Sequence, residues 1–334
     1  MIAFLRRFFG LAKIETADEP ILASENTPEN TAAPEKTATA WRPALDVDSR
    51  FYPWLLGEKG SLIANVTEKP LLAALDRLCR SEFAGSNLIP RVPSVLPQLL
   101  KSLRDENVSG EELARHISRD VALVAELITE VNSSYYSPVD KISSLDNAIR
   151  LLGVNGLRML VARTAFRPLI QLQSGQITKV LAPVIWEQSE KCALACRLLA
   201  QERQLDAFHG FLAGLLQNVG LIIAFRTVDQ SMPNQAMSLS TEFRLRFLHM
   251  AQILSYRIAQ QWDFPPLVTE ALKQQFGSSD PLQGLALVVR QAGDLSKLRM
   301  LVNAGVISEQ DEELAFSPGD QIQNIFLTLN QVSQ

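Results

Sequence analysis

Apolar residues recur along this chain at the three- and four-residue spacing of an α-helix, and this periodicity limits the possible folds more than any other feature. Leu71, Leu75 and Leu78 form one such stripe, and residues 186 to 200 carry another. Alternating runs of β-branched residues, which indicate half-buried strands, are scarce. Because 47% of the 334 residues are hydrophobic, the chain can bury one large core or two smaller ones. We therefore expect an all-α protein.

Charge and cysteine content narrow the class of protein. The formal net charge of −4 argues against general nucleic-acid binding, which normally requires a basic excess. Cys79, Cys192 and Cys196 are too few and odd in number for a disulfide framework, which fits a reducing cytoplasm. Cys192 and Cys196 lie one helical turn apart, so a metal pair is conceivable. No CxxC motif or nearby His supports it, and small core residues are the better interpretation.

The first residues have a different character. Residues 2 to 13, within the segment 1–14, place Arg6, Arg7 and Lys13 opposite several apolar side chains. Such a basic amphipathic segment can lie on an anionic membrane, here the inner face, or dock in a groove. Packing on its own domain, or fraying, is the simpler alternative. The arginines interrupt the apolar run as a signal peptide would not, and no stretch reaches the roughly 18 apolar residues of a membrane span.

Composition divides the rest of the chain. Residues 15–40 are rich in Glu, Thr, Ala and Pro and are predicted to be a disordered linker, because they hold too few large apolar residues to offset the entropy of ordering. Residues 41–87 regain apolar density as a small helical preface. Residues 88–285 carry the dense helical pattern of the main domain, and residues 286–334 supply closing helices.

Local signals mark helix boundaries in the first half of the main domain. Asp120 stands before a helical run and would place a carboxylate at its positive end. Ser143 with Asp146 has the spacing of a helix cap. Gly153 is expected to end that helix in a left-handed conformation, with a new helix directly after it.

The segment GLLQNVG, from Gly214 to Gly220, resembles the core helix of the HD superfamily of metal-dependent phosphohydrolases. In that superfamily the segment usually reads GLLHDIG, and the adjacent His and Asp bind a catalytic metal. Here Gln217 and Asn218 occupy those two places. Neutral amides compete poorly with water for divalent metals that are held by His nitrogen and carboxylate oxygen.

Further motifs extend the resemblance to the HDOD domain, the HD-related output domain of bacterial signalling proteins. The runs ELARHISRDVALVAELITEVNSSYYS and ISSLDNAIRLLG resemble its first half, and a W-x-x-S segment with AGLL resembles its second. Val121 replaces a proline that is usual in the family. The residues that fall on family positions are Asp120, Asn132, Ser133, Tyr136, Ser144, Ala148, Ile149, Gly153, Trp186, Ser189 and Gly214. We expect them to be structural.

The resemblance implies an N-terminal helical bundle, residues 88–175, packed against a degenerate HD-like bundle, residues 176–285. It also implies a regulatory role, since many members of the family lack the metal ligands.

The resemblance also implies where the lost metal ligands would lie. Gln188 stands near the position of the first His, and Gln274 lies in the region of a later one. With Gln217 and Asn218, these amides replace every ligand that can be aligned, so no metal or catalytic residue is predicted. The four amides would either line a polar pocket for a small ligand or be buried and hydrogen-bond one another.

We therefore predict a non-catalytic bacterial signalling module that binds a protein partner or a small ligand, a nucleotide second messenger among the candidates. One alternative is an HD-type phosphohydrolase, although His116, His209 and His249 lie outside the expected ligand register. The other is DNA binding through a helix-turn-helix-like segment, residues 111–132, whose acidic residues do not suit phosphate or base contacts. The sequence has no Walker loop, GxSxG or GxGxxG motif, and it indicates no cofactor.

Overall fold

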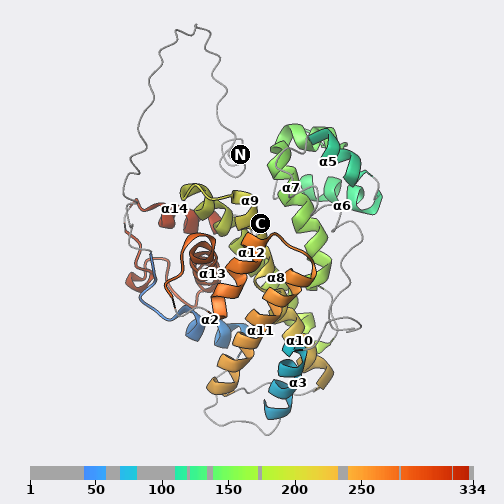
Figure 1. Ribbon diagram of the computed structural model, residues 1–334. Coiled ribbons are helices and arrows are strands. Elements are labelled where there is room, and N and C mark those ends of the chain that lie inside the picture. The colour runs from blue at the N-terminus through green and yellow to red at the C-terminus, as the bar shows by residue number, and fades with distance from the viewer. Residues whose placement is uncertain are drawn as a thin grey trace, which may run out of the picture.

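The computed structural model describes residues 41–57, 68–80, 110–118, 121–133, 138–171, 175–231, 240–277, 280–317 and 319–330. Within these ranges every regular element is a helix, which confirms the prediction of an all-α fold (Figure 1). The predicted amphipathic segment 2–13, the linker 15–40 and Asp120 lie outside the described residues.

The first half of the main domain contributes three helices. They are α5 (Gly110–Ile117), α6 (Val121–Val131) and α7 (Leu145–Gln171), and both short helices pack on α7. Leu113, Ile117 and Leu127 are buried in this bundle. Figure 1 shows it as a separate lobe, from which the long α7 runs down to the other helices.

Helix α7 has a break in its first third. The hydroxyl Oγ of Ser144 accepts a hydrogen bond from the Asn147 amide at 3.2 Å, so Ser144 is the cap and the prediction of Ser143 was one residue early. Gly153 has φ 70° and ψ 173°, a conformation that residues with a Cβ avoid. The predicted end of a helix at Gly153 is confirmed, and the next helical segment begins immediately.

The second half is built from longer helices. In chain order they are α8 (Gln176–Glu202), α9 (Ala207–Leu216), α10 (Val219–Ser231), α11 (Thr241–Gln261), α12 (Pro266–Gly277) and α13 (Gly284–Asn303), then the short 3-10 helix η1 (Glu312–Leu314) and α14 (Gln321–Thr328). The carboxylate of Asp229 on α10 caps α8, because it accepts bonds from the amides of Ile177 and Thr178, each at 2.9 Å. Side chains thus fix the angle between neighbouring helices as well as their ends.

Glycines let two pairs of these helices, α8 with α9 and α10 with α11, approach closely. A Cβ added to Gly214 would lie 2.7 Å from the Cα of Ala193, so α9 and α8 are in backbone contact there. A Cβ on Gly220 would overlap the carbonyl oxygen of Ala251 on α11. The two glycines of the GLLQNVG segment therefore bring its central amides close to α8 and α11.

The preface and the closing helices belong to the same core as the HD-like half. Helix α2 (Val47–Leu56) packs against α8 and α13, and α3 (Glu68–Arg80) packs against α10 and α11. The predicted boundary at residue 285 falls in the first turn of α13. Helices α2, α3 and α13, which were predicted to lie partly or wholly outside the main domain, therefore complete its second half.

One stretch, Ala207–Ser231, is long and apolar enough to cross a membrane, which the sequence analysis had excluded. The stretch has no unbroken run of about 18 apolar residues, because Gln217 and Asn218 interrupt it, but its mean hydropathy is high in spite of them. Of this window, 89% is buried inside the protein. It comprises α9 and α10, which form the centre of the bundle.

Candidate functional site

The junction between α9 and α10 carries Gln217 and Asn218. Gln217 is the last residue of the α9 ladder, since its amide donates to the carbonyl of Ala213. The carbonyl of Asn218 accepts from the amides of Leu221 and Ile222, so α10 starts from it. This change of helix direction points both amide side chains toward neighbouring helices.

The side chain of Asn218 belongs to a buried polar network. Its Nδ2 donates to the hydroxyl of Ser189 at 3.0 Å and to Oε1 of Gln188. The Nε2 of Gln188 donates in turn to the hydroxyl of Ser296 at 2.8 Å, and that hydroxyl donates to the carbonyl of Gly293. Gln188 is 2% exposed and Asn218 7%. Of the two possibilities for these amides, Gln188 and Asn218 follow the second: they are buried and bond to each other.

Gln217 has a different environment. Its Nε2 donates to the Cys192 sulfur, and its backbone carbonyl accepts from the hydroxyl of Ser255 at 2.7 Å. The Sγ atoms of Cys192 and Cys196 are 3.9 Å apart in the core. Burial and the neighbouring thiol raise the pKa of Cys196 well above its ordinary value. Both side chains are fully buried, so these cysteines are core residues.

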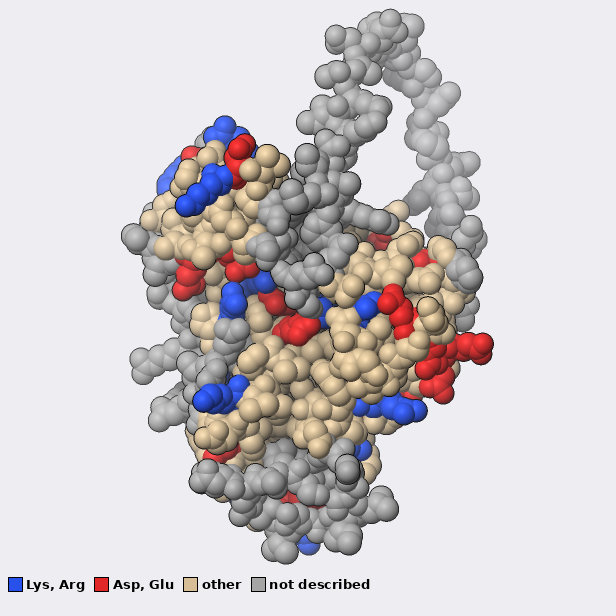
Figure 2. Space-filling view, turned by 180° about the vertical axis from the view of Figure 1, so that it is seen from behind, with Lys and Arg blue, Asp and Glu red and all other residues tan. Residues whose placement is uncertain are grey.

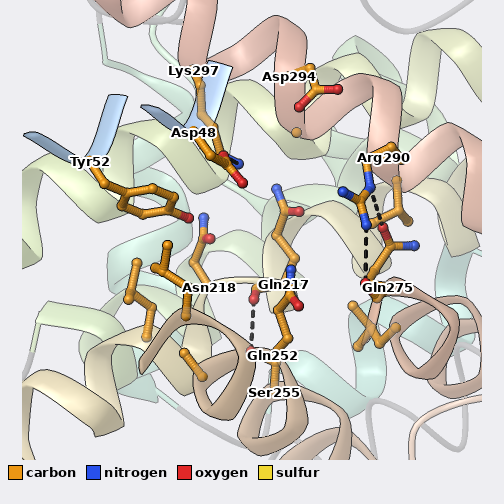
Figure 3. Close-up of a pocket in the computed structure, with 16 residues that line it drawn as sticks. Asp48, Tyr52, Gln217, Asn218, Gln252, Ser255, Gln275, Arg290, Asp294 and Lys297 are labelled. Atoms are coloured by element: carbon orange, nitrogen blue, oxygen red, sulfur yellow. Dashed lines mark hydrogen bonds and ion pairs between the residues drawn. The ribbon is translucent and has the colours of Figure 1, made fainter. Parts of the chain in front are cut away.

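Gln217 and Asn218 also lie on the wall of a pocket that five helical elements enclose (Figure 3). Its volume is about 60 Å³. A cavity needs roughly 10–15 Å³ to hold one water, so this pocket has room for a few water molecules. The residues that line the pocket are Asp48, Tyr52, Gln217, Asn218, Leu221, Leu248, Ala251, Gln252, Ser255, Leu272, Gln275, Val289, Arg290, Gly293, Asp294 and Lys297.

An ion pair between α2 and α13 closes one side of this pocket. The Nζ atom of Lys297 lies 2.5 Å from Oδ1 of Asp48 and 5.3 Å from the ring centre of Tyr52. The side chain of Lys297 is 13% exposed, while that of Asp48 is 45% exposed. The ammonium group of Lys297 is therefore buried under α2, which supplies its partners Asp48 and Tyr52.

The pocket shifts the pKa values of its charged groups. Burial lowers the pKa of Lys297, but Asp48, Tyr52 and Asp294 outweigh it, and the net shift is upward. Burial raises the pKa of Tyr52 to about 12. Burial also raises the pKa of Asp294 to about 6, with a contribution from Asp48. Lys297 is therefore charged at neutral pH, while Asp294 titrates close to neutrality.

Gln275, rather than Gln274, lies in the pocket. Its side-chain oxygen accepts from Nε of Arg290 at 3.2 Å, and its Nε2 donates to the carbonyl of Ala286. Gln274 bonds to Glu270 on the outer face of α12, so its predicted place beside the other amides was wrong. Successive residues of a helix point about 100° apart, and one position therefore decides which face is reached.

The family-motif residues that the structure describes are not among those that line the pocket. Asn132 joins the end of α6 to the following loop, because its side chain donates to the carbonyl of Ile142 and accepts from the amide of the same residue, at 2.7 and 2.8 Å. Trp186 is 4% exposed in the core. Ser133 follows α6, and Ser189 belongs to the polar network. The structural role expected of the motif residues stays a prediction.

The segment proposed for DNA binding forms α5 and α6, with Leu113, Ile117 and Leu127 buried against α7. On the face drawn in Figure 2, basic side chains are scattered among acidic ones without forming a continuous stripe. His209 pairs with Asp206 at 3.2 Å, and His249 packs edge-on against Phe276. These contacts place the two histidines away from the amide network.

The donor set at the former metal position does not fit a hydrolytic metal centre. The side chains that meet there are the amides of Gln188, Gln217 and Asn218, the hydroxyl of Ser189 and the thiol of Cys192. None supplies the carboxylate or imidazole that holds such an ion and activates its water. Within the described ranges, no three His, Cys, Asp or Glu side chains form a potential metal site.

The charged half of the pocket was not predicted from the sequence motifs. Asp48 comes from the preface, and Arg290, Asp294 and Lys297 come from α13, outside the part of the chain that carries the family motifs. The spacing of Asp294 and Lys297 does put them on one helix face, but nothing local connects that face to α2. Only the tertiary arrangement brings these residues to the amides.

Solved structures with the same architecture come from several bacteria. An HDOD domain protein of unknown function from Geobacter sulfurreducens aligns over 78% of this chain and 94% of its own, with 19% identity and a TM-score of 0.55. A Shewanella amazonensis protein, provisionally named a metal-dependent phosphohydrolase, aligns over 81% and 100%, with 16% identity and a TM-score of 0.54. A Marinobacter aquaeolei protein, provisionally named a signal transduction protein, aligns over 82% and 68%, with 18% identity and a TM-score of 0.54. These likenesses show a common fold.

Sequence comparison gives the family. An uncharacterized protein from Treponema pallidum is 22% identical over 195 residues, which are 55% of this chain and 37% of that protein, so this chain spans well under half of that relative. The sequence model of the HDOD domain matches residues 89–276, more than half of the chain. The chain therefore belongs to the HDOD domain family.

Proposed function

We propose that this protein is a non-catalytic regulatory module of a bacterial signalling pathway, and that it acts by binding at the pocket between α2 and α13. The observation that carries the proposal is the network of Gln188, Ser189, Asn218 and Ser296. These side chains satisfy one another without an ion, at the place where the HD superfamily holds its metal. The name of the Marinobacter relative agrees with a signalling role.

The size of the pocket favours a protein partner over a large ligand. A volume of about 60 Å³ is far below that of a nucleotide, and drug-sized ligands occupy roughly 300–1,000 Å³. A nucleotide second messenger would fit only after α2 had moved. A protein partner can instead use the surface around α2 and α13.

A metal and activity assay tests the non-catalytic part. We expect the purified chain, supplied with Mn²⁺, Mg²⁺ or Fe²⁺, to retain no stoichiometric metal and to hydrolyse neither phosphodiesters nor nucleotides. The matched variants are Gln217→Ala, which removes the amide that donates to Cys192 beside the network, and Gln274→Ala, which removes an amide on the outer face of α12. Tight metal and turnover that both disappear in Gln217→Ala, and persist in Gln274→Ala, would establish a phosphohydrolase instead.

A capture experiment from the native host tests the binding part. We expect the wild-type chain to retain a partner that Lys297→Glu loses, because this change reverses the charge at the centre of the pocket. Glu270→Lys, on the exposed face of α12, serves as the charge-matched control and should retain the partner. Equal recovery with all three chains would mean that the pocket is not the binding surface.

A further inference from the structure

The helix that covers the pocket shows what the pocket can recognise. Val47, Phe51 and Leu55 form a buried stripe on α2 at positions i, i+4 and i+8. Asp48 and Tyr52, one turn apart, lie beside that stripe and reach Lys297. We call the wall of the pocket that lies against α2, with Arg290, Asp294 and Lys297 of α13 on it, the α2 groove (Figure 3).

We propose that the α2 groove is a docking site for a partner helix that presents an acidic residue, an aromatic residue one turn later and an apolar stripe, and that α2 occupies this site as an internal competitor. The inference rests on the proposed function, since it specifies the partner of the same pocket. Recognition of an amphipathic helix in a groove is a common mode of protein–protein binding.

The charges of the groove are complementary to such a helix. Without α2, the groove holds two cations, Lys297 and Arg290, and one carboxylate, Asp294. The excess of one positive charge favours a helix that carries a carboxylate. On α2 this carboxylate is Asp48, which Lys297 and Arg290 hold in its ionised form against the effect of burial, so that its pKa is lowered.

Two features weaken the binding of α2 to the groove. Helix α2 has ten residues and contains Pro53, and isolated helices shorter than about 12–15 residues are marginal in water. Asp46 and Asp48 also face Asp294, whose raised pKa reflects this repulsion together with burial. A longer helix with a single well-placed acid would relieve the repulsion and keep the pairing with Lys297.

A synthetic fluorescent peptide of residues 41–57 is the probe for the test. In the full-length chain the tethered α2 competes at an effective concentration near the millimolar range, so we expect weak binding of the peptide to the wild type. A loosened chain, Asp48→Lys with Phe51→Ala, should bind the peptide at least about tenfold more tightly in fluorescence anisotropy. Asp140→Lys, a change of an exposed aspartate in the N-terminal bundle, is the charge-matched control and should bind like wild type.

A charge exchange makes the test specific for the groove. Adding Lys297→Glu to the loosened chain should abolish binding of the peptide. A peptide with Asp48→Lys should then restore it, because the ion pair is re-formed with its signs reversed.

Three results would overturn the proposal. The first is a loosened chain that keeps the helix content of the wild type and binds the peptide no better. The second, which needs no variant, is hydrogen exchange in the wild type that is as slow for the amides of α2 as for those of α13, since a competitor must open locally. The third is a concentration-dependent dimer that the peptide dissociates, which would assign the groove to a second copy of this chain. None of these results produces metal-dependent hydrolysis, the result that would overturn the proposed function.

Discussion

At position 218 an amide does what a carboxylate cannot do. Its Nδ2 donates to the side-chain oxygens of Gln188 and Ser189, and a carboxylate has no proton to donate to either. An ionised acid at this 7%-exposed position would also be desolvated without a cation beside it in the network. The amide at position 218 therefore suits the hydrogen bonds of this network, whereas a carboxylate would not.

Asn218→Asp should lower the free energy of unfolding by about 1–3 kcal/mol at neutral pH, the usual cost of leaving a buried polar partner unsatisfied. The loss should shrink as the pH falls, because a protonated carboxyl group can again donate a hydrogen bond. Urea unfolding at pH 7 and pH 5 measures both effects. The control is Asn324→Asp on the exposed face of α14, and equal losses in the two variants would contradict this account of the network.

The raised pKa of Asp294 predicts a second pH dependence of the stability. Its pKa is about 6 in the folded protein and 3.8 ordinarily, so the folded state binds its proton more tightly. Stability from this group is fully present below about pH 4 and falls as the pH rises to about 6. Asp294→Asn should therefore raise the free energy of unfolding at pH 7.5 by about 1–3 kcal/mol, with partial exposure favouring the lower figure.

The same comparison at pH 4 should give no difference between Asp294→Asn and the wild type. Asp140→Asn, a change of an exposed carboxyl in the other lobe, serves as the control and should show no such trend. A benefit of Asp294→Asn that is equal at both pH values would mean that packing, rather than charge, is responsible.

The positions of single site residues could be predicted only where a local sequence motif marks them. Gln217 and Asn218 stand inside a recognisable helix motif, and their place at the centre of the HD-like half followed from it. Gln274 was chosen from a run of adjacent polar residues, where the helix phase was uncertain by one position. Asp48 and Lys297 are 249 positions apart, and no pattern in the sequence relates them.

At the scale of elements, the contact between α10 and α11 depends on Gly220. A methyl group there would overlap the Ala251 carbonyl and lie 2.5 Å from the Ser255 amide. Because both contacts are backbone atoms, the helices must separate, and Gly220→Ala should cost at least about 3 kcal/mol. Gly277→Ala, at the end of α12 with open space around it, should change the stability by less than about 1 kcal/mol. Thermal unfolding of both variants measures the difference, and similar melting temperatures would contradict the close approach.

Helix boundaries were predictable where one residue type has a special backbone role. The break in α7 followed from Gly153, since few other residues adopt a positive φ. The cap of α8 did not, because its carboxylate, Asp229, comes from α10, more than fifty residues later in the sequence. Local chemistry thus indicates where a helix can end, while tertiary contacts decide how its end is satisfied.

At the scale of the whole molecule, the segment 41–57 holds the two ends of the described chain together. The indole of Trp41 stacks on Phe316 with ring centres 5.6 Å apart, and its Nε1 donates to the Leu314 carbonyl. The carbonyl of Trp41 also accepts from Gln291 on α13. The preface therefore acts as a brace across the HD-like half.

Two truncations test this brace. Removal of residues 1–40, which lack a core-like apolar pattern beyond the first 13 residues, should leave the melting temperature unchanged. Removal of residues 1–57 should lower it by several degrees, because it exposes the apolar groove beneath Phe51 and Leu55. Differential scanning calorimetry distinguishes the two, and a loss of cooperative unfolding on removal of residues 1–40 would contradict the linker assignment.

The overall architecture followed from the sequence, since helical periodicity gave the fold class and ordered motifs gave the two halves. The completion of the HD-like half by α2, α3 and α13 did not follow. These helices lie on both sides of the motif-bearing region in the sequence. An amphipathic face shows that a helix packs on something, but it does not identify the helix on which it packs.

The pairing of Asp48 with Lys297 also sets an order of events during synthesis. The 249 residues from 49 to 297 must be made before α2 has its cation, and at roughly 5–20 residues per second this takes about 12–50 s. The amides of the GLLQNVG segment are made late in that interval, and they precede by about 80 residues the cation that pairs with α2.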